Sequence, residues 1–436
     1  MPDQLIKELA LYAQTKDGLS DRAILRALED ALAPIKDRLK KVLLVPPDFT
    51  RFHSDAGKIA GMLYGMLNPG CRVDVLVALG THVKMSRSEW EKMYSPIPYE
   101  RMLVHNWRTD VVTLGEVESS LVSRLSEGLM NEPIPVEINR HLLDPEYDLI
   151  LSIGQVVPHE VVGMANHAKN IFVGCGGSKM INASHMLGAL YGMERMMGRD
   201  HTPVRALFDH AAQRFLGGLP LSYLLTVTDA PEGQIRLHGL FGGSGRACFE
   251  KAVRLSAQIN MDLLDRPLKK AVVYLDGQEF KSTWLGNKAI YRTRMAMADG
   301  GELIILAPGV EKFGEDEQVD RLIRAHGYRG RQQVLKAIRG SEELAQNLSA
   351  AAHLIHGSSE GRFSITYCTS RLSREEVEQA GFNYLPYEEA ARCYPPDRLK
   401  AGFNLLPDGE EIFYTPNPAL GLWALRSRFE QTGETG

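Results

Sequence analysis

The sequence predicts an α/β protein of two domains, with mainly parallel sheets and an active-site cleft between the domains. Short apolar and β-branched runs alternate with stretches long enough for helices, which is the order of βαβ units. The runs are almost continuously apolar, as expected where helices cover both faces of a parallel sheet. At 436 residues the chain is also longer than one hydrophobic core usually supports.

The six clearest strand runs each lead into a turn residue such as Gly, Pro or Asp. Together with the residues that follow them, the runs span, in chain order, 41–51, 72–82, 147–160, 269–280, 301–309 and 361–371. Ligands of parallel sheets bind beyond the carboxyl ends of the strands, so the residues after each run are the first candidates for a site. After the first three runs these are Asp48, Thr50, Arg51, His82 and His159.

The domain boundary is predicted near Asp265–Arg266–Pro267, where a second series of strands and helices begins. The first domain is expected over 1–265 and the second over 266–409. The tail, 410–436, has a strand-like start and an amphipathic end, and we expect it to pack back on the first domain.

Composition and charge exclude several classes of function. The net charge is −4, which leaves no basic excess for a nucleic acid backbone. No segment is apolar over the length needed to cross a bilayer, and the N-terminus reads as an amphipathic helix rather than a signal peptide. The five cysteines lack CxxC spacing and do not form a disulfide framework. We therefore expect a cytoplasmic protein without nucleic acid or membrane partners.

The segment 154–188 is the densest in chemically active residues. It has little hydrophobic periodicity, and compact domains rarely keep so long an irregular segment unless it lines a site. Its candidates are His159, Lys169 and His185. A lone histidine is more often a hydrogen-bonded or surface residue, which is the interpretation favoured for His167. Similarly, Lys179 is expected to be solvated, and core packing is expected for Met186, Met193, Met196 and Met197.

Three familiar motifs fail in this region. His159-Glu160 begins like a zinc protease helix, but Gly163 stands where the second histidine is needed. The run 174–180 lacks the order of a P-loop, and 242–247 lacks the dinucleotide spacing and its preceding strand. The sequence therefore favours neither a metalloprotease nor a standard nucleotide-binding enzyme.

The motif PPDFTR (46–51) is a different kind of signal. Two prolines end the strand, after which Asp48 and Arg51 can point into one site. An arginine fork suits a carboxylate, and an aspartate suits orienting a histidine. A plain helix start, with Asp48 as cap and Arg51 as a surface charge, explains the motif equally well on its own.

Together these residues resemble the lactate racemase family of nickel-pincer enzymes. The resemblance rests on Asp-Phe-Thr-Arg after the first strand, Gly-x-His after the second, and Pro-His followed by a lysine and a further histidine. The lysine stands ten residues after His159, and His185 stands sixteen after the lysine. The resemblance continues at Lys288, which begins a helix, and so covers most of the chain.

The resemblance implies a role for each matching residue. Lys169 would hold the cofactor, a nickel-pincer nucleotide of the nickel pyridinium-3,5-bisthiocarboxylic acid mononucleotide type, through a thioamide. His185 would complete the nickel coordination. His82 and His159 would be the acid-base pair, and Asp48 would support them. Arg51 and Lys288 would hold the carboxylate of a 2-hydroxy acid substrate. The implied partners are the enzymes that make the cofactor.

The chemistry of these residue types agrees with a racemase or 2-epimerase. Inversion needs proton transfer at both faces of the substrate, and two histidines suit that task. Soft sulfur and carbon donors with one imidazole suit nickel.

One departure affects the substrate. Trp284 and Leu285 stand where a tyrosine-glutamine pair is expected in lactate-using members, so a sugar acid (an aldonate) is favoured over lactate, with Trp284 against its carbon chain.

Two alternatives remain open from the residues alone. One is a hydrolase or lyase whose metal is bound directly by His82, His159 and His185, which leaves no task for Lys169. The other is a two-domain protein that binds a carboxylate through Arg51 and Lys288 without catalysis.

Overall fold

The chain divides into two compact units. The computed structural model describes residues 5–68, 70–419 and 421–431. The first unit consists of Met1–Ser184 and Gly198–Asn260, and the second of His185–Met197 and Met261–Gly436. The main boundary thus falls at 260/261 instead of 265/266. The inclusion of His185–Met197 in the second unit was not expected from the sequence.

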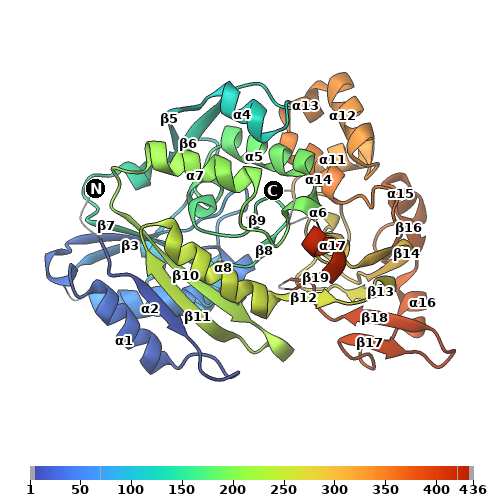
Figure 1. Cartoon of the computed structure of the whole chain (residues 1–436), viewed down its shortest axis with the longest axis horizontal. Coiled ribbons are helices and arrows are strands. Elements are labelled where there is room, and N and C mark those ends of the chain that lie inside the picture. Colours follow the sequence, from blue (N-terminus) through green and yellow to red (C-terminus); the bar gives the residue numbers. More distant parts are fainter. Residues whose placement is uncertain (1–4, 69, 420, 432–436) are drawn as a thin grey trace. The chain divides into compact units, whose positions relative to one another are not determined.

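A seven-stranded sheet forms the centre of the first unit (Figure 1). Its strand order is β1-β11-β10-β7-β2-β3-β4. Strands β10, β7, β2, β3 and β4 are parallel to one another, whereas β11 is antiparallel to both of its neighbours, β10 and β1. The strands are β1 (Leu9–Tyr12), β2 (Lys41–Val45), β3 (Arg72–Leu76), β4 (Met102–Leu103), β7 (Leu149–Gln155), β10 (Leu221–Asp229) and β11 (Arg236–Gly243).

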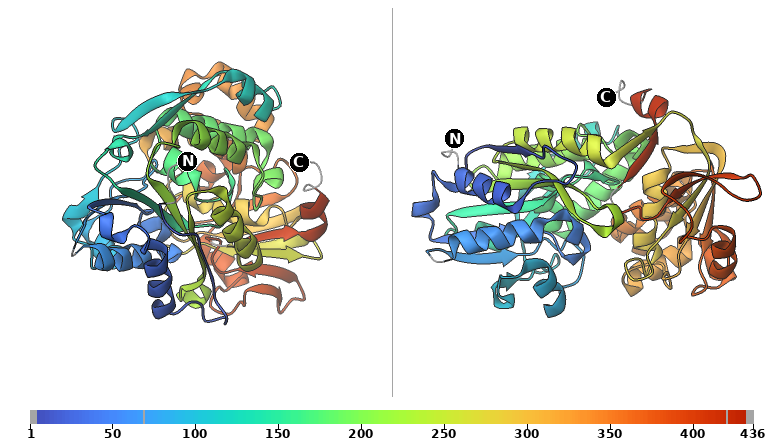
Figure 2. Two further views of the ribbon diagram at one scale, coloured as in Figure 1. Left: turned by 60° about the vertical axis from the view of Figure 1, so that its left-hand side comes forward. Right: turned by 90° about the horizontal axis from the view of Figure 1, so that it is seen from below.

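Helices cover both faces of this sheet (Figure 2). Helices α1 (Asp21–Leu32) and α2 (Ala56–Leu67) place Leu28 and Leu63 in one core cluster with Leu44 of β2 and Leu151 of β7. Helix α8 (Arg246–Asn260) packs on the other face. On this face Gly239 leaves room for Leu255 of α8, because a Cβ on Gly239 would lie 2.5 Å from Cδ2 of Leu255. Burial on both faces explains the continuous apolar runs.

The remaining elements of the first unit lie outside the sheet. The strands are β5 (Val111–Val117), β6 (Ile134–Asn139), β8 (Pro158–His159) and β9 (Gly163–Met164). The helices are α3 (Arg87–Tyr94), α4 (Ser119–Leu125) and α7 (Pro203–Phe215), with the short η1 (Lys36–Arg38), η2 (Phe49–Ser54), η3 (Tyr99–Arg101), η4 (Arg140–Leu143), the π-helical η5 (Asn170–Gly174) and η6 (Pro231–Gly233). Helix α5 (Ser178–Tyr191) contains the boundary between Ser184 and His185.

The second unit is built on a six-stranded sheet in the order β16-β15-β14-β13-β18-β17. All neighbours are parallel except β17 and β18. Its strands are β13 (Leu268–Tyr274), β14 (Met297–Leu306), β15 (Ser364–Cys368), β16 (Asn383–Leu385), β17 (Gly402–Leu405) and β18 (Glu411–Thr415). A separate pair joins β12 (Met261–Leu264) and β19 (Leu422–Leu425).

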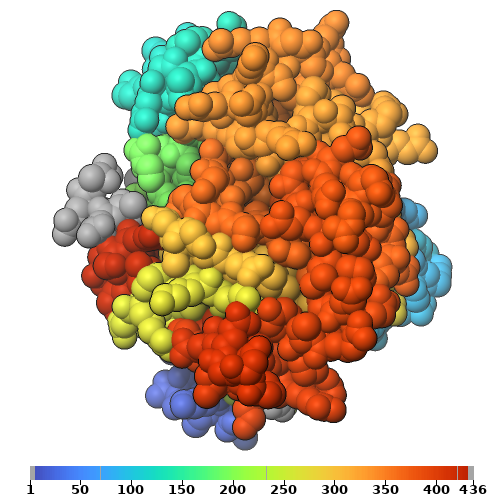
Figure 3. All heavy atoms as spheres, turned by 90° about the vertical axis from the view of Figure 1, so that its right-hand side faces the viewer, coloured from blue at the N-terminus to red at the C-terminus, as the bar shows by residue number. Residues whose placement is uncertain are grey.

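The helices of the second unit are mostly short. Those after β14 contribute to the face shown in Figure 3. The helices are α6 (Met193–Met196), α9 (Thr283–Gly286), α10 (Lys288–Thr293), α11 (Glu317–His326), α12 (Arg331–Gly340), α13 (Glu342–Gln346), α14 (Leu348–His356), α15 (Arg374–Gln379), α16 (Tyr387–Cys393) and α17 (Arg426–Gln431).

The predicted α/β class with mainly parallel sheets is confirmed. The segment 410–436 contributes two described strands. β18 is parallel to β13 inside the second sheet, whereas β19 is parallel to β12, whose residues lie within the first domain as expected from the sequence, 1–265. The strand-like start of this segment is indeed a strand, but its partners are distant in sequence, and periodicity carries no information about pairing partners. In the described part of the chain, no helix combines the length and apolarity needed to cross a bilayer.

Candidate active site

Asp48 and His82 form a hydrogen-bonded pair at the carboxyl ends of adjacent strands. Asp48 follows β2 and His82 follows β3, and Pro47 and Ala78 extend the parallel pairing of these strands. The distance between His82 Nδ1 and Asp48 Oδ2 is 2.6 Å. The carboxylate therefore accepts the Nδ1 proton and directs Nε2 toward any reacting group.

Thr50 and Arg51 extend this pair. The Thr50 hydroxyl donates to Asp48 Oδ1 at 2.6 Å, and Arg51 Nη1 donates to Thr50 Oγ1 at 3.1 Å. Burial by itself would raise the pKa of Asp48, but the hydrogen bond and charge of His82, with Arg51 and Thr50, lower the pKa below its ordinary value. Asp48 is thus a buried, ionised carboxylate that orients a half-buried histidine.

His159 lies in the short antiparallel pair of β8 and β9 and is buried. The Val161 backbone N–H donates to its Nδ1 at 3.1 Å, so the neutral ring carries its proton on Nε2. Glu160 Oε2 lies 3.8 Å from the same Nδ1. Nδ1 is therefore engaged in both candidate acid-base histidines, but with opposite roles: it donates in His82, which leaves Nε2 unprotonated, and it accepts in His159, which leaves a proton on Nε2.

The segment that carries Lys169 packs across β7 through two small residues of that strand. Asn170 Nδ2 donates to Ser152 Oγ at 2.9 Å and to the Val45 carbonyl at 3.0 Å. A Cβ on Gly154 would lie 2.1 Å from Asn166 Nδ2, so only glycine admits this approach. Alternate residues of β7 point into the apolar core, and the face with Ser152 and Gly154 receives the segment.

Lys169 is half-buried, and its pKa is lowered to about 8. Desolvation is the largest cause, followed by the positive charge of Arg51, and Arg205 acts in the same direction. The charges of Glu160 and Asp48 oppose them. Lowered lysine pKa values favour the neutral amine, which is the nucleophilic form. The two carboxylates and two guanidinium groups also place Lys169 in one electrostatic neighbourhood with Asp48 and Arg51.

The glycine-rich run after Lys169 is required by packing. A Cβ on Gly176 would lie 1.8 Å from the Phe172 carbonyl oxygen, and one on Gly177 would lie 2.2 Å from Glu137 Oε2. Lys179, at the end of the run, is exposed as expected for a solvated lysine. These glycines therefore allow close contacts within the protein, consistent with the failed P-loop test.

The remaining predicted residues belong to the second unit. His185 is half-buried on α5, and Lys288 is half-buried at the start of α10 with its Nζ 5.5 Å from the centre of the Phe280 ring. The Trp284 indole stacks on His353 with ring centres 4.1 Å apart. One face of Trp284 is thus occupied by His353.

Two tyrosines hold His353 in place. The Tyr291 hydroxyl lies 2.8 Å from its Nδ1 and the Tyr328 hydroxyl lies 3.0 Å from its Nε2. His353 was not a candidate from the sequence, because an isolated histidine in a helix carries no motif. The same applies to Arg205 of α7. Glu160 was noticed only as part of the failed zinc protease motif.

His167 is neither on the surface nor hydrogen-bonded through its ring to another described residue. Its ring stacks between Tyr223 and Phe249, with centres 4.0 and 5.2 Å away. Burial, then the charges of Arg205 and Arg246, hold its pKa well below the ordinary value. The ring is therefore a neutral packing element. The four methionines of the Met cluster are buried, as core packing requires.

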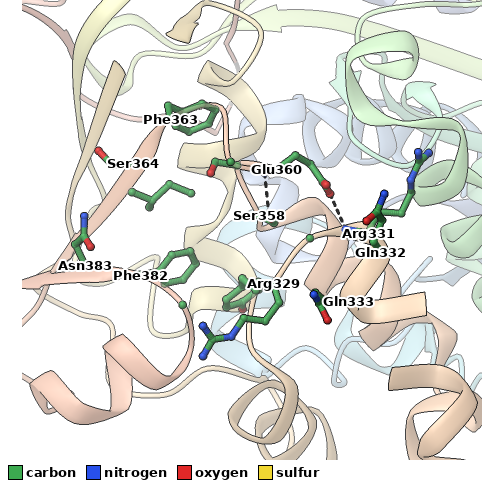
Figure 4. Close-up of a pocket in the computed structure, with 16 residues that line it drawn as sticks. Arg329, Arg331, Gln332, Gln333, Ser358, Glu360, Phe363, Ser364, Phe382 and Asn383 are labelled. Carbon is green, nitrogen blue, oxygen red and sulfur yellow. Dashed lines mark hydrogen bonds between the residues drawn. The ribbon is translucent and has the colours of Figure 1, made fainter. Parts of the chain in front are cut away.

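The described residues contain no group of three or more His, Cys, Asp or Glu side chains placed to bind a metal ion directly. A pocket of 580 Å³ lies in the second unit and is shown in Figure 4. It holds none of the predicted residues and includes Ser364 and Asn383, the first residues of β15 and β16. That is the strand end opposite to the one where α/β sheets bind ligands. Glu360, on its wall, accepts the Arg331 backbone N–H at 2.8 Å and so caps α12.

Comparison with known families identifies the first part of the chain. Residues 3–198 match the family model of the lactate racemase N-terminal domain. Over these residues the chain is similar to the lactate racemase N-terminal domain. The resemblance seen in the sequence is thereby confirmed, and the matched lactate racemase region contains Asp48, His82, His159, Lys169 and His185. The match to this domain supports a function of the racemase or epimerase type, which is an isomerase activity.

Solved structures extend the similarity to both units. A crystal structure of a protein from Thermotoga maritima is 25% identical and aligns with a TM-score of 0.80 over 95% of this chain and 100% of that chain. The lactate racemase apoprotein from Thermoanaerobacterium thermosaccharolyticum is 17% identical, with a TM-score of 0.70 over 97% of this chain and 96% of that chain. At that identity the second match shows the fold alone. The search of curated proteins found no match.

Proposed function

We propose that this chain inverts the hydroxyl-bearing carbon of a 2-hydroxy acid with a nickel-pincer nucleotide held on Lys169. The observation that carries the proposal is the lysine itself. A half-buried amine with a pKa of about 8 lies within the electrostatic reach of Arg51 and of Asp48, the carboxylate that orients His82. Perturbed pKa values of this kind cluster at functional sites.

The residues present fit this group. The Lys169 amine, whose pKa is lowered to about 8, suits attachment through a thioamide, and the half-buried His185 imidazole suits a single nickel position. A metal held by one histidine and by donors of a cofactor needs no cluster of protein ligands, and the described residues show none. When bound, the cofactor supplies the hydride chemistry at the alpha carbon.

The protein residues supply binding and proton transfer. Arg51, with Lys288, would hold the substrate carboxylate by charge-assisted hydrogen bonds. The Nε2 atom of His82 would take the hydroxyl proton, while Asp48 accepts the Nδ1 hydrogen bond and stabilises the imidazolium that forms. For the opposite configuration His159 would give the proton of Nε2 from its imidazolium form, in which Nδ1 exchanges the Val161 N–H for a proton that faces Glu160 Oε2, 3.8 Å away.

The substrate is proposed to be a longer polyhydroxy acid of the aldonate type, inverted at carbon 2. Support comes from Trp284, a broad aromatic surface that stacks on His353, and the His353 ring is itself held by Tyr291 and Tyr328. Such a surface suits the C–H face of a sugar chain. Leu285 lacks the amide that the resemblance predicts for lactate-using members.

The test is covalent attachment. The chain should be produced together with the enzymes that make the cofactor, and intact mass with peptide mapping should place a nucleotide adduct on Lys169. Lys169→Gln should abolish the adduct and the activity, whereas Lys179→Gln, a change at an exposed lysine, should alter neither. An unmodified Lys169 in active, nickel-containing protein would overturn the proposal in favour of a directly bound metal.

A further inference from the structure

Arg205 of α7 is one of the most deeply buried side chains of the first unit, with 1% of its surface exposed. Its Nη2 donates to the Met164 carbonyl at 2.7 Å, and Nη1 and Nη2 reach the Asn166 carbonyl at 3.3 and 3.2 Å. Its guanidinium also lies 4.3 Å from the centre of the Phe249 ring. A charged group buried against neutral carbonyls is expensive, so its presence calls for a function.

The nearby carboxylates pair with a different arginine. Arg246 bonds Asp200 at 2.6 Å and also bonds Asp209 and Glu250. Asp200 and Asp209 still act on Arg205 at longer range. Within the described residues, the hydrogen bonds of the Arg205 guanidinium thus run to the backbone that leads to Lys169.

That backbone is in an unusual conformation. Asn166 and His167 have φ angles of 70° and 56°, two consecutive non-glycine residues in the left-handed region. The Asn166 side chain accepts the His167 N–H at 2.7 Å, and the Asn170 N–H bonds to the His167 carbonyl at 2.9 Å. Strain of this kind persists only where neighbours enforce it and is typical of functional sites. The fork of Arg205 is such a neighbour, and Lys169 follows two residues after the turn.

We propose that Arg205 is a positioning residue for Lys169: it holds the turn at Met164–His167 and thereby sets the place and the reactivity of the lysine amine. The inference rests on the proposed function, in which that amine carries the cofactor. The buried charge of Arg205 supports the effect on reactivity, since Arg205 is among the groups that lower the pKa of Lys169.

The experiment uses the full chain without cofactor, so its readout is independent of activity. The chain is acetylated with limiting acetyl N-hydroxysuccinimide ester over a range of pH, and peptide mass spectrometry measures labelling of Lys169 with exposed Lys179 as internal reference. In the wild type, labelling of Lys169 should reach half its maximum near pH 8. Arg205→Gln should move the midpoint upward by about one pH unit, which is roughly a fivefold loss of labelling at pH 8.

Arg205→Lys separates the hydrogen bonds from the charge. It keeps the positive charge but not the planar fork that reaches both carbonyls. The midpoint should stay near that of the wild type, while the maximal labelling rate at high pH should change severalfold. Arg246→Gln is the matched control, because Arg246 also contacts Phe249 but is absent from the groups that act on Lys169. It should leave both quantities unchanged.

The outcomes are decisive in each case. The proposal would be overturned if the labelling midpoint of Lys169 stayed unchanged in Arg205→Gln and its maximal labelling rate stayed unchanged in Arg205→Lys. If Arg205→Gln does not fold, the maximal rate of Arg205→Lys decides alone. A wild-type chain that labels as expected, yet never acquires a nucleotide adduct from the cofactor-producing host, would refute the proposed function and leave the positioning role intact.

Discussion

At the scale of single residues, the candidate site is a set of side chains whose polar atoms are fixed by neighbours. Asp48 fixes Nδ1 of His82, the Val161 N–H fixes Nδ1 of His159, and Asn170 is tied to Ser152. Fixing one nitrogen of each histidine selects the tautomer that the other nitrogen presents. Lys169 differs from these residues, because desolvation and nearby charges lower the pKa of its amine.

The first prediction separates the roles of three histidines. His82→Ala and His159→Ala should each lower kcat by roughly a hundredfold or more, the scale of general acid-base catalysis, and should keep the nickel. His185→Ala should instead reduce nickel retention. Metal content by mass spectrometry and steady-state kinetics on cofactor-loaded protein check both. Retained metal in His185→Ala together with lost metal in His82→Ala would reverse the assignment.

The second prediction follows from the pKa of Lys169. The value is about 8 in the folded chain against 10.5 for an unperturbed lysine, so between these pH values the unfolded chain binds the extra proton. The contribution of Lys169 to the free energy of unfolding is therefore unfavourable below pH 8 and fades as the pH rises toward 10.5. In the chain without cofactor, Lys169→Met should be more stable than the wild type near pH 7, and this advantage should shrink as the pH rises.

Urea denaturation at several pH values measures the difference. The control is Lys179→Met, at an exposed lysine, which should show no such dependence. An advantage of Lys169→Met that grows with pH would contradict the assigned charge state.

At the scale of elements, the segment from β8 to η5 depends on contacts that only small residues permit. Gly154 lets Asn166 approach β7, and Gly176 lies against the Phe172 carbonyl. Gly65, on α2, faces open space, because a Cβ at this position would meet no neighbouring atom within 4 Å. The three glycines should therefore respond differently to the same substitution.

The third prediction compares these glycines. Gly154→Ala and Gly176→Ala should destabilise the fold by about 1–3 kcal/mol, because the added methyl groups meet a side-chain amide and a backbone carbonyl. Gly65→Ala should stabilise the fold by about 0.5–1 kcal/mol through helix propensity. Thermal unfolding measures all three. If the labelling of Lys169 also falls in Gly154→Ala, the β7 contact supports the lysine. Equal stabilities of the Gly154 and Gly65 variants would refute the packing argument.

The strands of the sheets and the candidate residues at their ends could be predicted from the sequence, for physical reasons. Apolar runs mark strands buried on both faces, and residues after them mark the ligand end, which located Asp48, His82 and His159. Long-range features could not be predicted in this way. The fork of Arg205 and the stacking of Trp284 on His353 depend on which elements become neighbours, and neither leaves a periodic trace. The pairing of β18 with β13 was missed for the same reason.

At the scale of the whole molecule, the residues proposed for the reaction come from both units. Asp48, Arg51, His82, His159 and Lys169 belong to the first, and His185, Trp284 and Lys288 to the second. The lactate racemase N-terminal domain match ends at residue 198 and so includes the cofactor residues but not Trp284 or Lys288. Under the proposed function, the residues for the reaction class and those for substrate preference therefore lie in separate parts of the chain.

The last prediction concerns that substrate preference. On nickel-loaded enzyme, kcat/KM should be higher for an aldonate such as gluconate than for malate or lactate, because the carboxylate anchors are retained while Trp284 offers an apolar surface. Replacing Trp284 and Leu285 by the tyrosine-glutamine pair should move preference toward lactate. A buried hydrogen-bond partner is worth about 1–3 kcal/mol, or roughly five- to a hundredfold in kcat/KM. His353→Gln serves as a control for disturbed packing, because it removes the ring on which Trp284 stacks and leaves Trp284 itself in place. This variant should weaken turnover of the aldonate without favouring lactate. A wild-type preference for lactate would refute the aldonate proposal and leave the racemase chemistry standing.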